Sequence, residues 1–178
     1  QTPVQVTRGQ WRATAKPRTL VSYGDVMRGQ MRRPPIDIDD HRALAEFRYQ
    51  IRRFMAFSER AARDAGIEPQ QHQLLLALTG LPDGAAPTIG ELAERLQIQH
   101  HSTVELVSRL ARRDLVRRTR NPADRRQVFV EMTDEGREIM SRLSAVHLEE
   151  LHRVGPELTR ALNAIVAETT QVAPDRRA

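Results

Sequence analysis

The 178-residue sequence contains no cysteine, and this absence excludes several kinds of chemistry. Disulfides, thiolate nucleophiles, cysteine-ligated zinc and thiol-based redox sensing all need that residue. Lysine is almost absent, because Lys16 is the only one beside 27 arginines. No apolar run approaches the roughly 20 residues that span a bilayer, and the basic N-terminus is not followed by the apolar stretch of a secretory signal. The sequence therefore predicts a cytoplasmic protein with no membrane partner.

Positive charge is concentrated in two segments of the chain. Residues 1–33 carry seven cations against Asp25 alone, so the remainder is close to neutral. The stretch from Arg109 to Arg126 holds eight arginines against Asp114 and Asp124. A dense local patch of this kind is typical of nucleic-acid binding. The alternative is a merely solvated run of charges.

Residues 1–36 show four prolines and no sustained apolar period. This composition predicts a basic, flexible N-terminal extension, and a short helix from Tyr23 to Met31 is the alternative. Since the chain begins with Gln1, Met27 or Met31 is a plausible native start. A tail of similar character is predicted for residues 173–178.

The next segments have the three- and four-residue apolar spacing of helices. One helix is predicted over 39–65, with Asp37 or Asp39 as its N-cap and Gly66 after its end. A second is predicted from Pro69 to Gly80, followed by a proline-rich loop at 82–87. A short third helix is predicted over 88–96, beginning at Thr88 with Glu91 placed as in a capping box.

A tight turn at Gln97 and Ile98 precedes a fourth helix, predicted over 99–113. Its inward stripe is expected to be Thr103, Leu106, Val107 and Leu110, and its outward face to be His101, Glu105, Ser108, Arg109 and Arg112. Two short helices joined in this way are typical of a helix-turn-helix.

After residue 113 the apolar period changes to two, which predicts a β-hairpin. Its strands are expected at 115–120 and 126–132, with a basic tip between them. Thr133 is placed to cap a further helix, and Gly155–Pro156 is expected to end that helix and begin a last one. The predicted fold class is mainly α with a small β-hairpin wing.

Three segments resemble the MarR (multiple antibiotic resistance regulator) family of winged helix-turn-helix transcription regulators. They are residues 88–96 (TIGELAERL), residues 101–110 (HSTVELVSRL), and the wing with its exit at 115–118, 124–126 and 132–136. The resemblance spans about residues 40–170 and departs at Asp114, where the family usually has glycine. It implies a domain over 37–172, with a reader region at 69–132 between long dimerisation helices at 39–65 and 133–172.

By this resemblance the chain is expected to be a bacterial homodimer, commonly a repressor, on palindromic double-stranded DNA. Arg126, oriented by Asp124, is predicted to enter the minor groove, while Arg118, Arg120 and Arg125 contact phosphates. The predicted DNA-binding set is Gln99, His100, His101, Ser102, Glu105, Arg109, Arg112, Arg118, Arg120, Asp124, Arg125 and Arg126.

The family resemblance also implies a small aromatic or anionic effector, for which the candidate residues are Arg52, Phe57, Arg60 and His72. A ligand-insensitive architectural DNA-binding protein is the alternative. A metal-responsive regulator using His100 and His101 is disfavoured, because adjacent helical residues diverge. The apolar stripes fit an intrachain core as well as a dimer interface.

Other classes of function find little support in the sequence. It shows no glycine-rich phosphate loop, nucleophile elbow or metal-ligand spacing. We therefore expect no enzyme activity, cofactor or metal. A winged helix that binds protein or RNA is a further alternative, and the dense arginines of the wing argue against a protein partner.

Overall fold

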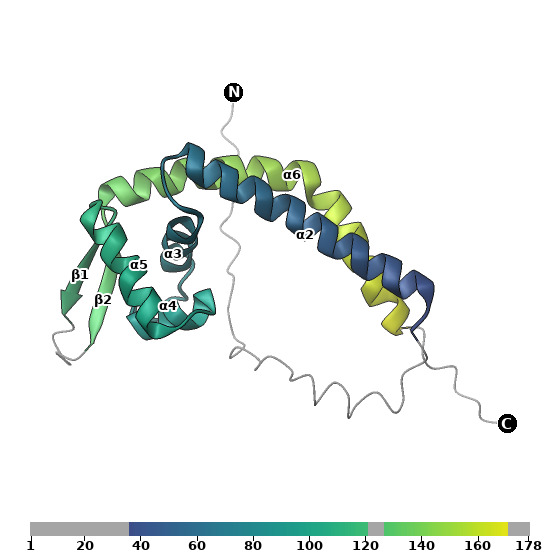
Figure 1. Cartoon of the computed structure of the whole chain (residues 1–178), viewed down its shortest axis with the longest axis horizontal. Coiled ribbons are helices and arrows are strands. Elements are labelled where there is room, and N and C mark those ends of the chain that lie inside the picture. Colours follow the sequence, from purple (N-terminus) through teal and green to yellow (C-terminus); the bar gives the residue numbers. More distant parts are fainter. Residues whose placement is uncertain (1–35, 121–126, 171–178) are drawn as a thin grey trace, which may run out of the picture. The chain divides into compact units, whose positions relative to one another are not determined.

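The computed structural model describes residues 36–120 and 127–170, with the backbone alone for 167–170. Two long helices, α2 (Ile38–Asp64) and α6 (Asp134–Thr170), lie side by side (Figure 1). The shorter elements gather near the beginning of α6: α3 (Pro69–Thr79), α4 (Ile89–Leu96), α5 (His100–Arg112), β1 (Val116–Arg120) and β2 (Val128–Met132). The predicted fold class is confirmed.

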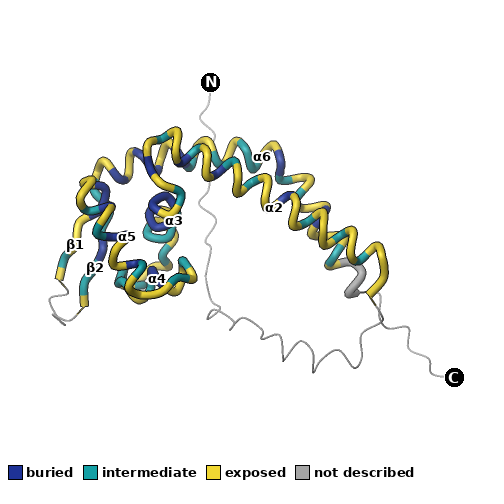
Figure 2. Tube along the Cα trace, viewed as in Figure 1, coloured by how far each residue is buried: buried dark blue, intermediate teal, exposed yellow. Residues whose placement is uncertain are grey.

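The apolar core lies among the shorter elements and the first turns of α6 (Figure 2). Leucines from α3, α4 and α5 meet valines from the hairpin there. The largest fully buried apolar side chains are Leu74, Leu75, Leu92, Leu110, Leu115, Val107, Val116 and Val130. This core holds the surface formed by α5 and the hairpin in a fixed arrangement.

Local sequence explains where the helices begin and turn. The Asp37 carboxylate accepts hydrogen bonds from the amides of Asp39 and Asp40, and the Asp40 carboxylate accepts one from the Asp37 amide. Thr88 Oγ1 accepts a bond from the Glu91 amide at 3.2 Å, so the predicted cap is present. The Glu91 carboxylate instead pairs with Arg95 at 2.9 Å, and the predicted capping box is only half formed.

Residues 134–170 form a single helix, and the predicted break at Gly155–Pro156 is therefore wrong. A proline inside a helix removes one backbone donor and crowds the carbonyl four residues earlier. The side chains of Val154 and Ala161, on either side of Pro156, are both buried. Because α6 packs along α2 before and after Pro156, tertiary contacts keep the helix continuous.

Hydrogen bonds and close packing join the hairpin to the end of α5 and to the beginning of α6. Asp114 has a φ of 56°, so it adopts the left-handed conformation at the position where the sequence departs from the family's usual glycine. The Thr133 hydroxyl donates to the Asp114 carbonyl at 2.6 Å and accepts from the Gly136 amide at 3.1 Å. A Cβ on Gly136 would lie 2.2 Å from the Leu115 carbonyl oxygen, so only glycine permits this approach.

Candidate nucleic-acid interface

Helices α4 and α5 meet through a tight turn in which Gln97 is left-handed, with a φ of 54°. The Ile98 amide donates to the Ala93 carbonyl at 3.1 Å and closes this turn. Helix α5 buries one stripe against the core: Thr103, Leu106, Val107 and Leu110. The opposite face lies at the surface, as predicted, and includes His101, Glu105, Arg109 and Arg112.

The N-terminal end of α5 is also open. Gln99, His100 and His101 are exposed, and Ser102 is half-buried. The N-cap residue Gln99 makes no side-chain capping hydrogen bond among the described residues. The first-turn amides of a helix are positively polarised and suited to bind an anionic oxygen. The predicted residues at this end are therefore brought together at one accessible terminus.

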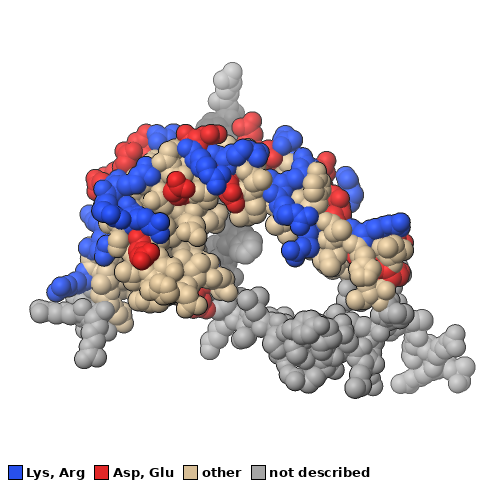
Figure 3. Space-filling view, in the orientation of Figure 1, with Lys and Arg blue, Asp and Glu red and all other residues tan. Residues whose placement is uncertain are grey.

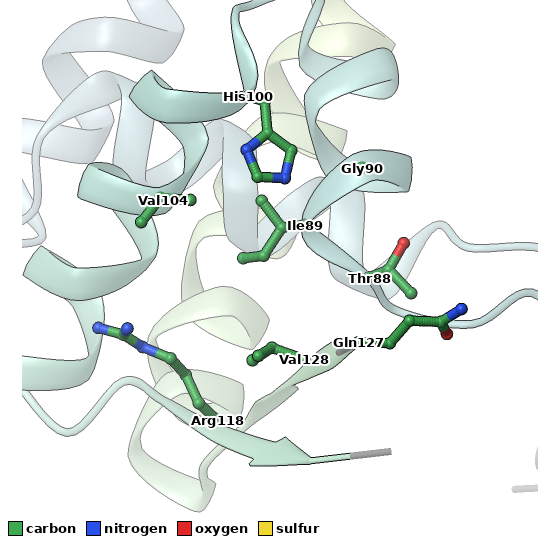
Figure 4. A pocket seen from close by; sticks show the side chains of 8 residues that line it. All are labelled: Thr88, Ile89, Gly90, His100, Val104, Arg118, Gln127 and Val128. Carbon is green, nitrogen blue, oxygen red and sulfur yellow. The ribbon is translucent and has the colours of Figure 1, made fainter. Parts of the chain in front are cut away.

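A cavity of about 380 Å³ lies between the start of α4, the start of α5 and the hairpin (Figure 4). Ile89, Val104 and Val128 form its apolar lining, while His100 points in from the beginning of α5. The Arg118 side chain extends from β1 toward α5 (Figure 4). Cationic and imidazole groups over an apolar lining suit a ligand with an anionic edge and an apolar side.

Of the six clustered arginines that the structure describes, Arg117 and Arg113 bind groups of the chain that hold the fold together. Arg117 on β1 lies opposite Glu131 on β2, and their side chains form an ion pair at 2.7 Å. The hydrogen bonds from Arg117 lower the pKa of the Glu131 carboxyl, and Thr119 adds a further one. Arg113 donates to the Gly66 carbonyl at 2.7 Å and ties the end of α5 to the corner after α2.

The other described arginines of the cluster face outward. Arg109 lies 4.0 Å from Glu105, and Arg118 donates to Ser108 Oγ at 2.8 Å. Arg112 and Arg120 are exposed, with no carboxylate at ion-pair distance among the described residues. Figure 3 shows basic side chains gathered over α5 and β1. Three predicted residues lie outside the described residues: Asp124, Arg125 and Arg126.

The four candidate effector residues separate into two groups. Arg52 and Arg60 are exposed on α2. Phe57 and His72 both contact His147 on α6, with ring centroids 5.7 and 4.7 Å from its own. The structure thus brings two of the four together, and the His147 ring lies against both.

His147 and His72 differ in their hydrogen bonding. His147 Nε2 lies 2.8 Å from Ser58 Oγ, and its Nδ1 lies 2.6 Å from the Leu143 carbonyl oxygen. His72 Nδ1 is buried without a hydrogen-bond partner among the described residues. Burial, and to a smaller extent the neighbouring His147, lower the pKa of His72 to about 4. The His72 ring is therefore neutral near pH 7.

The sequence analysis assigned no role to four side chains that make contacts in the folded chain: Arg113, Arg117, Glu131 and His147. The Arg117–Glu131 pair had a signal, because the hairpin register places opposite charges across from each other. His147 had no signal in the sequence, because its partners Ser58, Phe57 and His72 come from other helices. The link from Arg113 to Gly66 spans 47 residues, so local spacing gave no indication of it.

Within 36–120 and 127–170, no helix is long and apolar enough to cross a membrane. Over the same ranges, no three histidine or acidic side chains gather in a way that could hold a metal ion.

The chain is similar to known regulators in sequence and in fold. The profile of the MarR family matches residues 65–127. The uncharacterized HTH-type transcriptional regulator YsmB of Bacillus subtilis (strain 168) is 30% identical over 112 residues, which cover 61% of this chain and 75% of YsmB. The repressor MdtR of the same organism is 32% identical over 71 residues, covering 40% of this chain and 44% of MdtR.

Solved structures show the same fold. AbsC, a MarR family transcriptional regulator from Streptomyces coelicolor, superposes with a TM-score of 0.59 at 20% identity, covering 77% of this chain and 98% of AbsC. Sco3205 from the same organism, solved in complex with DNA, gives a TM-score of 0.59 at 24% identity over 82% of this chain and 95% of Sco3205. From the helix-turn-helix geometry, the family profile and the match to YsmB, the chain belongs to the MarR family of DNA-binding transcription regulators.

Proposed function

We propose that the chain is a cytoplasmic homodimeric repressor that binds a palindromic operator through α5 and the hairpin. The observation that carries this proposal is the accessible outer face of α5, with His101, Glu105, Arg109 and Arg112 exposed, beside the exposed arginines of β1. One α-helix fits the B-form major groove. The DNA complex of Sco3205, which has the same fold, gives further support.

The residues divide by the part of the duplex they would meet. Gln99, His100, His101 and Ser102 at the start of α5 would contact base edges or phosphates, and Glu105, Arg109 and Arg112 continue that face. Arg118 and Arg120 would contact phosphates from the hairpin, together with Arg125. For Arg126 in the minor groove, oriented by Asp124, the support is the sequence resemblance alone.

The homodimer is supported by apolar side chains that one copy leaves exposed on α2 and α6. They are Ile38, Leu44, Tyr49, Ile51, Met55, Val146, Leu148, Leu162 and Val166. Large apolar side chains exposed in this number on two neighbouring helices indicate an interaction site. A second copy covering these helices would place two reader regions on half-sites about one helical turn apart.

Sedimentation velocity tests the dimer with a matched pair of variants. Leu162 on α6 and Leu76 on α3 are 43% and 44% exposed. The same substitution at the two positions therefore compares a site on the long helices with an equally exposed site outside them. Leu162→Asp is expected to shift the protein toward monomer at micromolar concentration, because the partner would bury its charge. Leu76→Asp should leave the dimer intact. A wild-type monomer at all concentrations would overturn the homodimer.

A gel shift on the DNA upstream of the chain's own gene, titrated with salt, tests operator binding. Arg120→Ala is expected to weaken binding and to reduce the slope of log affinity against log salt by about one. Arg142 on α6, an exposed arginine paired with Glu138, supplies the control variant Arg142→Ala. Equal effects of the two variants would contradict a DNA contact at Arg120.

The effector proposal places a small aromatic or anionic molecule near Phe57, His72, Arg52 and Arg60. Its support is the convergence of Phe57 and His72 on His147, where α2, α3 and α6 meet. Benzoate is a simple probe that carries both an aromatic ring and a negative charge. It is expected to release wild-type protein from DNA at millimolar concentration and to act less on Phe57→Ala. No release by aromatic anions would favour the ligand-insensitive alternative.

A further inference from the structure

We infer that Ser108, on the outer face of α5, serves DNA binding by positioning the Arg118 guanidinium and not by contacting DNA itself. The inference rests on the proposed function, because it takes α5 and the hairpin as the DNA-binding surface. Ser108 lies on the predicted outward face of α5 and is not among the residues predicted to contact DNA.

Ser108 stands in the middle of a chain of two hydrogen bonds. Its hydroxyl donates to the Val104 carbonyl one turn earlier in α5, at 2.7 Å. The Arg118 Nη2 group donates to the same hydroxyl oxygen at 2.8 Å. A serine hydroxyl has a single proton. Because that proton is used within the helix, the oxygen is left as an acceptor, and it accepts from the guanidinium.

Arg118 is held without losing its charge. It lies on β1 opposite the buried Val130, and its side chain reaches toward α5 along the cavity (Figure 4). Its neighbour Arg117 is neutralised by Glu131, whereas the ion pairs of the described residues include none to Arg118. A guanidinium has five N–H donors. One bond to a neutral hydroxyl therefore leaves the full positive charge and most donors for an anionic oxygen.

A positioned arginine binds better than a free one for an entropic reason. A long side chain loses rotamer freedom when it is fixed at an interface. Where the free protein already holds the side chain in place, less freedom is lost on binding. The bond between Arg118 and Ser108 also joins the hairpin to α5. The distance between α5 and the Arg118 guanidinium is therefore set before the protein meets a duplex.

A double-mutant cycle tests this inference, with the probe being a duplex that wild-type protein selects from a randomised library. Ser108→Ala is expected to weaken binding about fivefold, as for loss of one hydrogen bond to a charged group at an exposed site. Arg118→Ala should weaken binding more. The variant carrying both changes should bind like Arg118→Ala alone, since Ser108 has no other route to the DNA.

Two further readouts separate positioning from a structural or direct role. Ser108→Ala keeps the Arg118 charge, so the salt slope should stay at the wild-type value, whereas Arg118→Ala should lower it by about one. Ser108→Thr retains the hydroxyl and should restore wild-type affinity. Ser141→Ala, at an exposed serine of α6, is the matched control and should change nothing.

Several outcomes would overturn the inference while the proposed function stands. One is an equal effect of Ser108→Ala with and without Arg118, which would make Ser108 a direct contact. Another is wild-type binding by Ser108→Ala, checked by an unchanged thermal melt. Failure of the wild-type protein to select any duplex would instead overturn the proposed function, and this inference with it.

Discussion

The region from Pro69 to Met132 and the two long helices bury their apolar side chains to very different degrees. The first region encloses the core, where Leu74, Leu75 and Leu110 are inaccessible to solvent. Along the 27 residues of α2, by contrast, the only buried side chains are Gln50, Ser58 and Ala62. The core of the first region is thus completed within one chain, by the end of α2 and the first turns of α6, whereas the remaining lengths of the two long helices expose large apolar side chains.

This difference indicates where a substitution acts on the fold and where it acts on assembly. Inside the reader region, large apolar side chains have their full set of neighbours within one chain. On the long helices, several apolar side chains have neighbours on one side only. Changes in the reader region should therefore alter unfolding directly, and changes on the long helices should alter it through protein concentration.

The largest expected effect comes from a buried leucine compared with an exposed one. Leu110→Ala should lower the free energy of unfolding by about 4 kcal/mol, because it leaves a cavity in the core. Leu148 on α6 is 56% exposed, and Leu148→Ala should cost about 0.5 kcal/mol or less in dilute protein. Denaturant unfolding at two protein concentrations measures both. Equal costs would remove the contrast between the two regions.

Gly136 tests the junction between the two regions. Gly136→Ala should destabilise the protein by about 3 kcal/mol, because the new Cβ would overlap the Leu115 carbonyl. Gly155 in α6 is the matched control, since a Cβ there meets nothing within 4 Å. Gly155→Ala should be neutral or slightly stabilising. A Gly136→Ala protein with the wild-type melting temperature would show that the junction can relax.

His72 makes the contact between α3 and α6 sensitive to acid. Burial holds the pKa of His72 at about 4 in the folded protein, against an ordinary value of 6.5. As pH falls below 6.5 the unfolded chain takes up a proton that the folded chain refuses, so stability is lost. We expect a decrease of about 2 kcal/mol between pH 7 and pH 5.

Unfolding titrations across that pH range measure the loss attributable to His72. His72→Leu should remove most of the pH dependence, although it also changes packing. His152 is exposed on α6, so His152→Gln should keep the wild-type dependence. A wild-type protein equally stable at pH 5 and pH 7 would contradict a buried neutral ring at His72.

The smallest expected effect is at the turn after α5. Asp114 is left-handed, a conformation that glycine adopts without a steric cost. Asp114→Gly should therefore stabilise the reader region by about 0.5–1 kcal/mol, and Asp114→Ala should destabilise it by a similar amount. Thermal unfolding of the two variants measures whether each change raises or lowers the stability. Destabilisation by glycine would mean that the Asp114 side chain itself contributes to the turn.

Where structure follows from neighbours in the sequence, the predictions were confirmed. The stripe of Thr103, Leu106 and Leu110 fixed the inner face of α5, and the change to a two-residue period located the hairpin. In each case, the controlling contacts lie within one element or between adjacent ones.

The sequence was a poor guide where contacts between segments distant in the chain determine the structure. Pro156 disfavours a helix locally, but packing of α6 against α2 outweighs that preference. The sequence assigned no role to Arg117 and Arg113, which bind Glu131 and the Gly66 carbonyl in the folded chain. Only the folded positions of these distant partners distinguish an arginine that stabilises the fold from one that is free to meet an anion.

Because α6 is continuous through Pro156, a rotation of one end of the helix also moves the other end. Its 37 residues, at 1.5 Å each, give it a length of about 55 Å along its curved axis, and it begins directly at the exit of the hairpin. A rotation of about 5° at the far end would displace the hairpin end by at most about 5 Å, a distance comparable with one turn of helix. In a dimer joined through α6, small angular changes far from the DNA would therefore set the separation of the two hairpins.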